Sequence, residues 1–81
     1  MQFIEVDAGD HRIYAAAILR GSGGFAAAVA VLRRLPCGDR REVFRDDDLG
    51  QGYPWPSARE ALRFALQRGH DIVMCGTGGA P

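Results

Sequence analysis

The chain has 81 residues, enough for one small domain, in which folding buries about 60% of the unfolded surface. Its 10 basic and 10 acidic residues cancel, and 47% of its residues are hydrophobic. This balance is typical of a globular protein, and it argues against a disordered chain or one strongly attracted to polyanions or membranes. We expect one domain over residues 1–75 and a flexible tail over residues 76–81.

The first ten residues contain a short strand signal at residues 3–6 and then a turn-rich stretch. Three acids stand where a signal peptide would carry basic residues, and no apolar run reaches about 18 residues. The two cysteines, Cys37 and Cys75, match no CxxC or zinc-site spacing. We therefore expect a cytoplasmic protein that does not enter a membrane.

Two apolar runs, residues 11–20 and 25–35, flank a glycine-rich loop. Their alanines favour helix by propensity, but neither run begins with a capping residue and an acidic first turn. Phe25, Val29 and Val31 instead fall on one side of an alternating strand pattern. We predict a β-hairpin here, with an antiparallel pair of helices as the alternative.

A turn at residues 36–39 precedes a further strand signal at residues 41–45, which alternate polar and apolar side chains. Simple alternation places Glu42 and Phe44 on one side of this strand and its two arginines on the other. Residues 46–51 are expected to be a polar break.

The clearest helix signal covers residues 57–69, where Ser57 and Glu60 form an S-x-x-E capping box. Gly69 is expected to end this helix as a left-handed C′ residue. Trp55, which lies between two prolines, is expected to cover the first turn.

The predicted helix has one apolar stripe, and Leu62 is expected to be its central buried residue. The residues expected beside it are Ala58, Ala65 and Leu66. Residues 71–74 are expected to form an edge strand or a docked tail. The predicted fold class is therefore α+β: an antiparallel β-meander of three to four strands, with one C-terminal amphipathic helix packed on one face.

This order of elements resembles a group of small uncharacterised proteobacterial proteins with a β-meander and one C-terminal helix. The resemblance is carried by the turn-to-strand step at residues 9–13, by Phe44-Arg45-Asp46, and by the helix entry from Tyr53 to Leu62. It implies the fold over residues 3–73. These proteins carry no assigned activity, so the resemblance implies no site.

Cys37 is the first candidate for chemistry, because nearby arginines favour a thiolate. A nucleophilic role also needs a positioned base, and nothing in the sequence places His11 or His70 beside it. Asp46, Asp47 and Asp48 suggest a cation site, but consecutive strand residues point to opposite faces. We expect no catalytic residue and no metal ligand here.

The glycine-rich runs at residues 21–24 and 76–79 have the composition of phosphate loops. Such a loop needs a helix N-terminus directly after it, and neither run leads into a predicted helix. We interpret them as a turn and a tail, and expect no cofactor.

A local excess of arginine suggests an anion or nucleic-acid surface as an alternative function. The residues concerned are Arg33, Arg34, Arg40, Arg41 and Arg45. Sheet-based RNA binders also need exposed aromatic side chains. The neutral net charge argues against this function.

The predicted hairpin is apolar on both sides, whereas one helix covers one face of a meander. A second copy of the chain commonly covers such a surplus apolar surface. We therefore expect a non-enzymatic protein-interaction or structural module that acts as a homodimer, through a sheet face or an edge strand. An unidentified protein partner is the other possibility.

Overall fold

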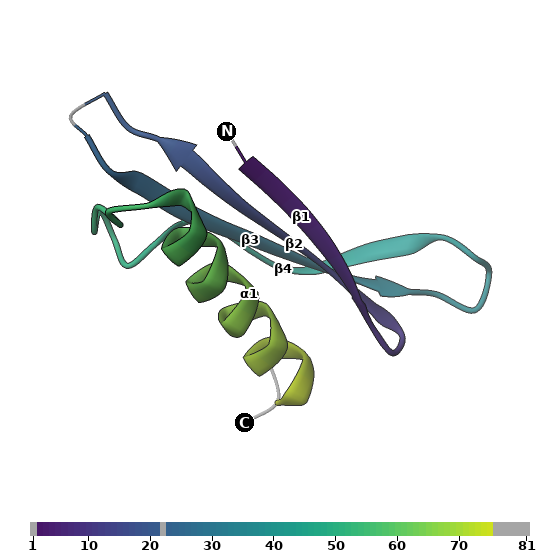
Figure 1. Ribbon diagram of the computed structural model, residues 1–81. Helices are drawn as coiled ribbons and strands as arrows, with labels where there is room; N and C mark the ends of the chain where they lie inside the picture. The colour runs from purple at the N-terminus through teal and green to yellow at the C-terminus, as the bar shows by residue number, and fades with distance from the viewer. Residues whose placement is uncertain (1, 22, 76–81) are drawn as a thin grey trace.

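The computed structural model describes residues 2–21 and 23–75, which form four strands followed by one helix (Figure 1). The elements are β1 (Gln2–Ala8), β2 (His11–Leu19), β3 (Phe25–Arg34), β4 (Arg40–Leu49) and α1 (Ala58–Met74). The predicted tail, residues 76–81, lies outside the described residues.

The four strands form one antiparallel sheet in the order β1-β2-β3-β4, and α1 lies across one face of it (Figure 1). The α+β meander predicted from the sequence is confirmed. The hairpin prediction is also confirmed, because Ile13 pairs with Val31 and Ala15 pairs with Val29. Packing of the side chains that alternate between the two faces of the paired strands stabilises the hairpin more than the helix propensity of the alanines opposes it.

β4 differs from its prediction in length and in facing. The expected polar break at residues 46–51 is wrong at its start, because the strand continues to Leu49, which is buried. The pairing shifts by one residue between the partners of Val31 and Leu32, so Glu42 and Arg45 share a face and Phe44 lies on the other. Such a bulge inserts one residue and reverses the alternation beyond it.

The end of α1 is another correction, because Gly69 does not terminate the helix. Gly69 lies inside α1 with its backbone against β2 and β3, where a Cβ would overlap the Cγ2 of Ile13 and lie 3.2 Å from the Cγ2 of Val29. Glycine is therefore used here for close packing between helix and sheet. Residues 71–74, expected as an edge strand or a docked tail, are the last turn of the helix.

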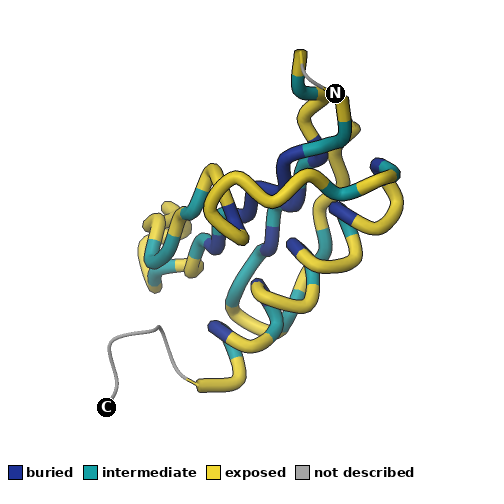
Figure 2. Tube along the Cα trace, turned by 90° about the vertical axis from the view of Figure 1, so that its left-hand side faces the viewer, coloured by how far each residue is buried: buried dark blue, intermediate teal, exposed yellow. Residues whose placement is uncertain are grey.

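The buried face of α1 is made of small residues, and Leu62 is not at its centre. Leu62 and Leu66 are half-buried at the side of the contact. The buried positions, spaced at helical intervals, are Ala58, Ala61, Ala65, Gly69 and Ile72. They pack on Ile13, Ala15, Ala17, Ala27, Val29 and Val31 of the central strands. Figure 2 shows buried positions both on the helix and on the strands beside it. Small side chains on both layers bring the helix close to the sheet.

The helix entry keeps most of its predicted contacts. The Oγ of Ser57 accepts a hydrogen bond from the backbone N–H of Glu60 at 3.2 Å, so Ser57 is the N-cap. The hydroxyl of Ser57 donates to the carboxylate of Glu60 at 3.3 Å, and the described bonds do not include the return bond of a full capping box. Trp55 pairs with the backbone of Phe25, and its ring lies 4.8 Å from that of Phe64, as expected of a cover over the first turn.

Within the described residues, α1 is neither long enough nor apolar enough to cross a membrane. This agrees with the sequence, in which no long apolar run occurs.

Candidate interaction surface

The sheet face opposite α1, called here the open face, is apolar along its two central strands. This follows from the sequence of β2 and β3, whose alternate positions are apolar on both sides. The open-face residues of these strands between the charged ends are Tyr14, Ala16, Ile18, Ala26, Ala28, Ala30 and Leu32. The described chain places no element over them.

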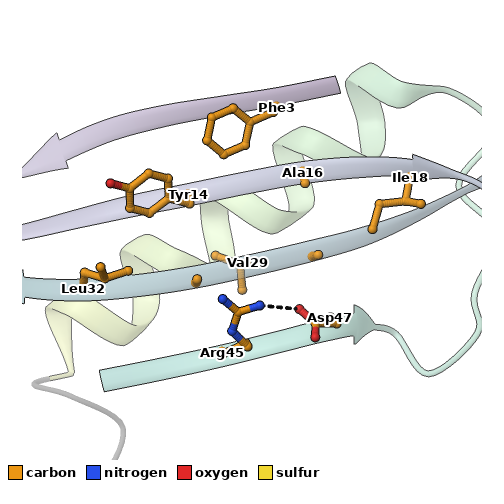
Figure 3. Close-up of a pocket in the computed structure, with 10 residues that line it drawn as sticks. Phe3, Tyr14, Ala16, Ile18, Val29, Leu32, Arg45 and Asp47 are labelled. Carbon is orange, nitrogen blue, oxygen red and sulfur yellow. Dashed lines mark hydrogen bonds and ion pairs between the residues drawn. The ribbon is translucent and has the colours of Figure 1, made fainter. Parts of the chain in front are cut away.

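A shallow hollow of about 390 Å³ lies in the open face (Figure 3). Phe3 of β1 and Tyr14 of β2 form one side of it, with their rings stacked at a centroid distance of 5.8 Å. Arg45 and Asp47 of β4 form the other side. The floor is made of alanines, so large side chains at the sides surround a low centre.

Two large apolar side chains of the open face are exposed, whereas Ala26 and Ala28 on the same face are buried. Ile13 and Val31, which face α1, are fully buried, whereas Phe3 is 53% exposed and Ile18 is 37% exposed. Because water contact with apolar side chains is unfavourable, burial of this face would contribute about 25 cal/mol per Å². The open face is therefore suited to contact with another apolar surface.

Charged residues surround the apolar centre of the open face in two groups. On the β1 side, Arg12 donates to Asp7 at 2.7 Å and contacts Glu5 at 3.4 Å. The hydrogen bond from Arg12, followed by its positive charge, holds the pKa of Asp7 below its ordinary value. The same contact raises the pKa of Arg12.

The second charged group lies on β4. Arg45 donates to Glu42 at 2.6 Å and contacts Asp47 at 3.4 Å. The hydrogen bond to Glu42 and the charge of that carboxylate raise the pKa of Arg45. Two acids therefore hold the Arg45 side chain at the side of the hollow.

The five arginines singled out from the sequence are divided between the two faces. Arg33 is paired with Arg41 and Arg34 with Arg40 across β3 and β4, so one pair lies on the helix side and the other on the open face. Arg34 and Arg40 line a small pocket together with Asp7 and Arg12. Arg45 also lies on the open face, so three of the five arginines share a surface.

The other sequence candidates lie apart from the open-face hollow. Cys37 is exposed in the loop after β3, where its Sγ lies 3.8 Å from an oxygen of Asp39. Asp46 and Asp48 belong to β4, and Asp48 contacts Arg20 at 2.8 Å. Among the described residues, no cluster of three potential metal ligands occurs.

Sequence reasoning missed Phe3, Tyr14 and the acids Glu5 and Asp7 as parts of one surface. The signal was present in the two-residue turn between β1 and β2, where Ala8 pairs with His11. A turn of this length fixes the register, and register fixes which residues share a face.

A second, smaller apolar groove lies between β1 and α1. Ile4, Leu62 and Leu66 line it, and Ile4 is 38% exposed. The groove exists because the helix packs over β2 and β3, and its side chains only partly cover β1. It lies on the helix side of the sheet and is separate from the open face.

Comparisons with known proteins add no functional information. No protein-family model matches the chain, and neither the curated proteins nor the solved structures contain a significant match to it. The functional argument therefore depends on the geometry and chemistry of the open face.

Proposed function

We propose that this protein is a non-enzymatic interaction module that acts as a homodimer through its open sheet face. The observation that carries the proposal is the apolar character of β2 and β3 on the side away from α1. A single helix covers one face of the sheet, and the other face has the composition of a second interior.

The size of the open face supports this function. Four strands of 7 to 10 residues give a face roughly 20 Å wide and about 30 Å long. Its projected area, roughly 600 Å², is of the same order as the ~800 Å² per partner buried in a standard interface. The apolar centre and charged surroundings also match the usual division of an interface into core and rim.

The edges of the sheet favour the face over edge-to-edge pairing at β4. This strand carries two irregularities in its pairing and three consecutive acids, Asp46 to Asp48. Bulges and charges of this kind oppose the addition of another strand. β1 is the less protected edge. A variant that disrupts the open face must therefore distinguish dimerisation through that face from dimerisation through β1.

A charge placed in the centre of the open face tests the proposal. Ala16→Glu puts a carboxylate beside the hollow, and Gln67→Glu adds the same charge on the exposed side of α1. We expect size-exclusion chromatography with light scattering to show Ala16→Glu as a monomer and Gln67→Glu as a dimer. If Ala16→Glu remains a folded dimer, then an edge strand or another surface forms the dimer.

Nucleic-acid binding is the second candidate function. One observation favours it: the stacked rings of Phe3 and Tyr14 share the open face with Arg34, Arg40 and Arg45. Exposed aromatic rings and arginines on one sheet are the features that bind single-stranded RNA. Glu5, Asp7, Glu42 and Asp47 on the same face oppose a polyanion, so we rank this function below dimerisation. Fluorescence anisotropy with a labelled single-stranded RNA tests it, with Tyr14→Ala as the variant expected to lose any binding.

A reducing compartment such as the cytoplasm fits the proposed module. Cys37 and Cys75 are both exposed free thiols. Exposed thiols remain reduced in the cytoplasm and tend to oxidise outside it.

A further inference from the structure

One row across the open face carries opposite charges at its two ends. Glu5 of β1 pairs with Tyr14 of β2, Tyr14 pairs with Ala30 of β3, and Ala30 pairs with Arg45 of β4. Directly paired residues project from the same face of an antiparallel sheet. The row is about 14 Å long, three strand spacings, so Glu5 and Arg45 of one chain are too far apart to bond to each other.

We propose that a second copy of the chain occupies the open face, related by a two-fold axis parallel to the strands, with Glu5 of each copy over Arg45 of the other. This inference rests on the proposed homodimer and specifies its geometry. Such an axis reverses the row, so β1 of one copy faces β4 of its partner. Symmetry then forms the Glu5–Arg45 pair twice, once at each side of the interface.

The other simple arrangement, with the axis perpendicular to the strands, is opposed by charge. It places each strand over its own copy, so the open-face acids of β1, Glu5 and Asp7, face the same acids of the partner. Like charges brought together in an interface are unfavourable. Both arrangements keep the strands of the two sheets roughly aligned, as face-packed sheets require, so the net charges of the two halves of the face decide between them.

The next row along the strands runs from Asp7 through Arg12 and Leu32 to Glu42, so the same axis places Asp7 over Glu42 of the partner. Each of these carboxylates is already bonded to an arginine of its own chain, Asp7 to Arg12 and Glu42 to Arg45.

The complementarity therefore lies in the net charge of the two halves of the face. The half formed by β1 and β2 carries two carboxylates and one guanidinium, Glu5, Asp7 and Arg12. The half formed by β3 and β4 carries three guanidiniums and two carboxylates, Arg34, Arg40, Arg45, Glu42 and Asp47. An axis parallel to the strands places the net negative half over the net positive half, twice.

Glu5 and Arg45 also have capacity for a further bond. Their side chains are 47% and 58% exposed. Arg45 uses Nε for Glu42 and Nη1 for Asp47, whereas a guanidinium has five N–H donors. These two contacts hold Arg45 beside the hollow, where a partner's carboxylate would meet it. Figure 3 shows Arg45 there with its contact to Asp47.

Charge reversal of each residue, and mixing of the two variants, tests this geometry. In a Glu5→Arg homodimer two arginines would face each other at both ends of the row, and in an Arg45→Glu homodimer two glutamates would do so. In the mixed dimer, both ends have opposite charges again. We expect each variant alone to dimerise about tenfold or more weakly than wild type, consistent with two reversed rim pairs. We expect an equimolar mixture to form the heterodimer, identified by mass in native mass spectrometry.

Two further variants keep the test independent of folding. Arg45→Glu removes the contacts of Arg45 with Glu42 and Asp47 within its own chain. Mixing with Glu5→Arg does not restore these contacts, so rescue of dimerisation by mixing reports the pair between the two chains. The double variant Glu5→Arg/Arg45→Glu should dimerise alone. Arg41→Glu makes the same charge change on the other face of β4 and should neither dissociate the dimer nor pair preferentially with Glu5→Arg.

The possible results separate this inference from the proposed function. A wild-type protein that remains a monomer overturns both. A wild-type dimer sensitive to Ala16→Glu, but whose charge variants mix without preference, overturns the axis and leaves the dimer face intact. A Glu5→Arg variant that dimerises more tightly than wild type contradicts the proposed axis and supports the perpendicular one.

Discussion

Gly69 of α1 lies directly against Ile13 of β2, with no room between them for a methyl group. This contact sets the distance between helix and sheet. The alanines at positions 61 and 65 continue the same close approach along the helix. The fold is therefore held by a small-residue helix face on an Ala- and Val-rich sheet face.

Gly69→Ala is expected to destabilise the protein although alanine is the better helix former. The new methyl overlaps Ile13, and overpacking of this kind costs about 1–3 kcal/mol, against a gain in helix propensity of at most ~1 kcal/mol. Urea unfolding at a fixed protein concentration measures the change. Combining Gly69→Ala with Ile13→Ala should cost less than the sum of the two single changes. Strict additivity would show that the two residues do not meet.

Ile72→Ala is expected to cost more stability than Leu62→Ala. Ile72 is 5% exposed and belongs to the core, whereas Leu62 is half-buried at the β1 side. Truncating a buried isoleucine costs about 2–5 kcal/mol. The midpoints of thermal unfolding of the two variants give the order. A lower midpoint for Leu62→Ala would mean that the helix is rotated towards β1.

Ser57→Ala removes the N-cap of α1. We expect a loss of about 1 kcal/mol, because the N–H of Glu60 loses its acceptor. Ser57→Asp retains an acceptor at the cap and should restore most of the loss in the same denaturant titration. Equal loss in both variants would show that the cap contributes nothing.

Asp7→Asn is expected to change how stability depends on pH. The pKa of Asp7 is lowered in the folded state, chiefly by the hydrogen bond from Arg12. A lowered pKa contributes stability above the unfolded value, 3.8, and this contribution is lost as the pH falls through the folded value. Wild type and Asp7→Asn should therefore differ at pH 6, and the difference should shrink as the pH falls below 3.8 in denaturant titrations. A constant difference across this range would contradict the contribution of Asp7.

The parts of the fold predicted from sequence are those set by local patterns. Strand alternation in β2 and β3 and the cap at Ser57 are properties of neighbouring residues, and both are confirmed. A glycine after a helical stripe is a common C′ signal, and this pattern predicts that the helix ends at Gly69. Its actual role depends on Ile13, which is distant in the sequence.

The open face was predictable in character but not in detail. Two-sided apolar strands predicted that a second apolar face would exist. The bulge in β4 places Arg45 on the same face of the sheet as Glu42, and no residue in the sequence predicts a bulge there. The row from Glu5 to Arg45 depends on that bulge and on the registers of three strand pairs, so the sequence alone did not reveal it.

Sedimentation equilibrium of the wild-type protein tests the central claim, that the open sheet face holds a second copy of the chain. Measurements from about one to one hundred micromolar cover the affinity range of many interfaces of this size. The account predicts a mass that rises from that of the 8.8 kDa chain towards twice that value. The same runs with Ala16→Glu should remain at the monomer mass. A wild-type protein of 8.8 kDa at every concentration would contradict the claim.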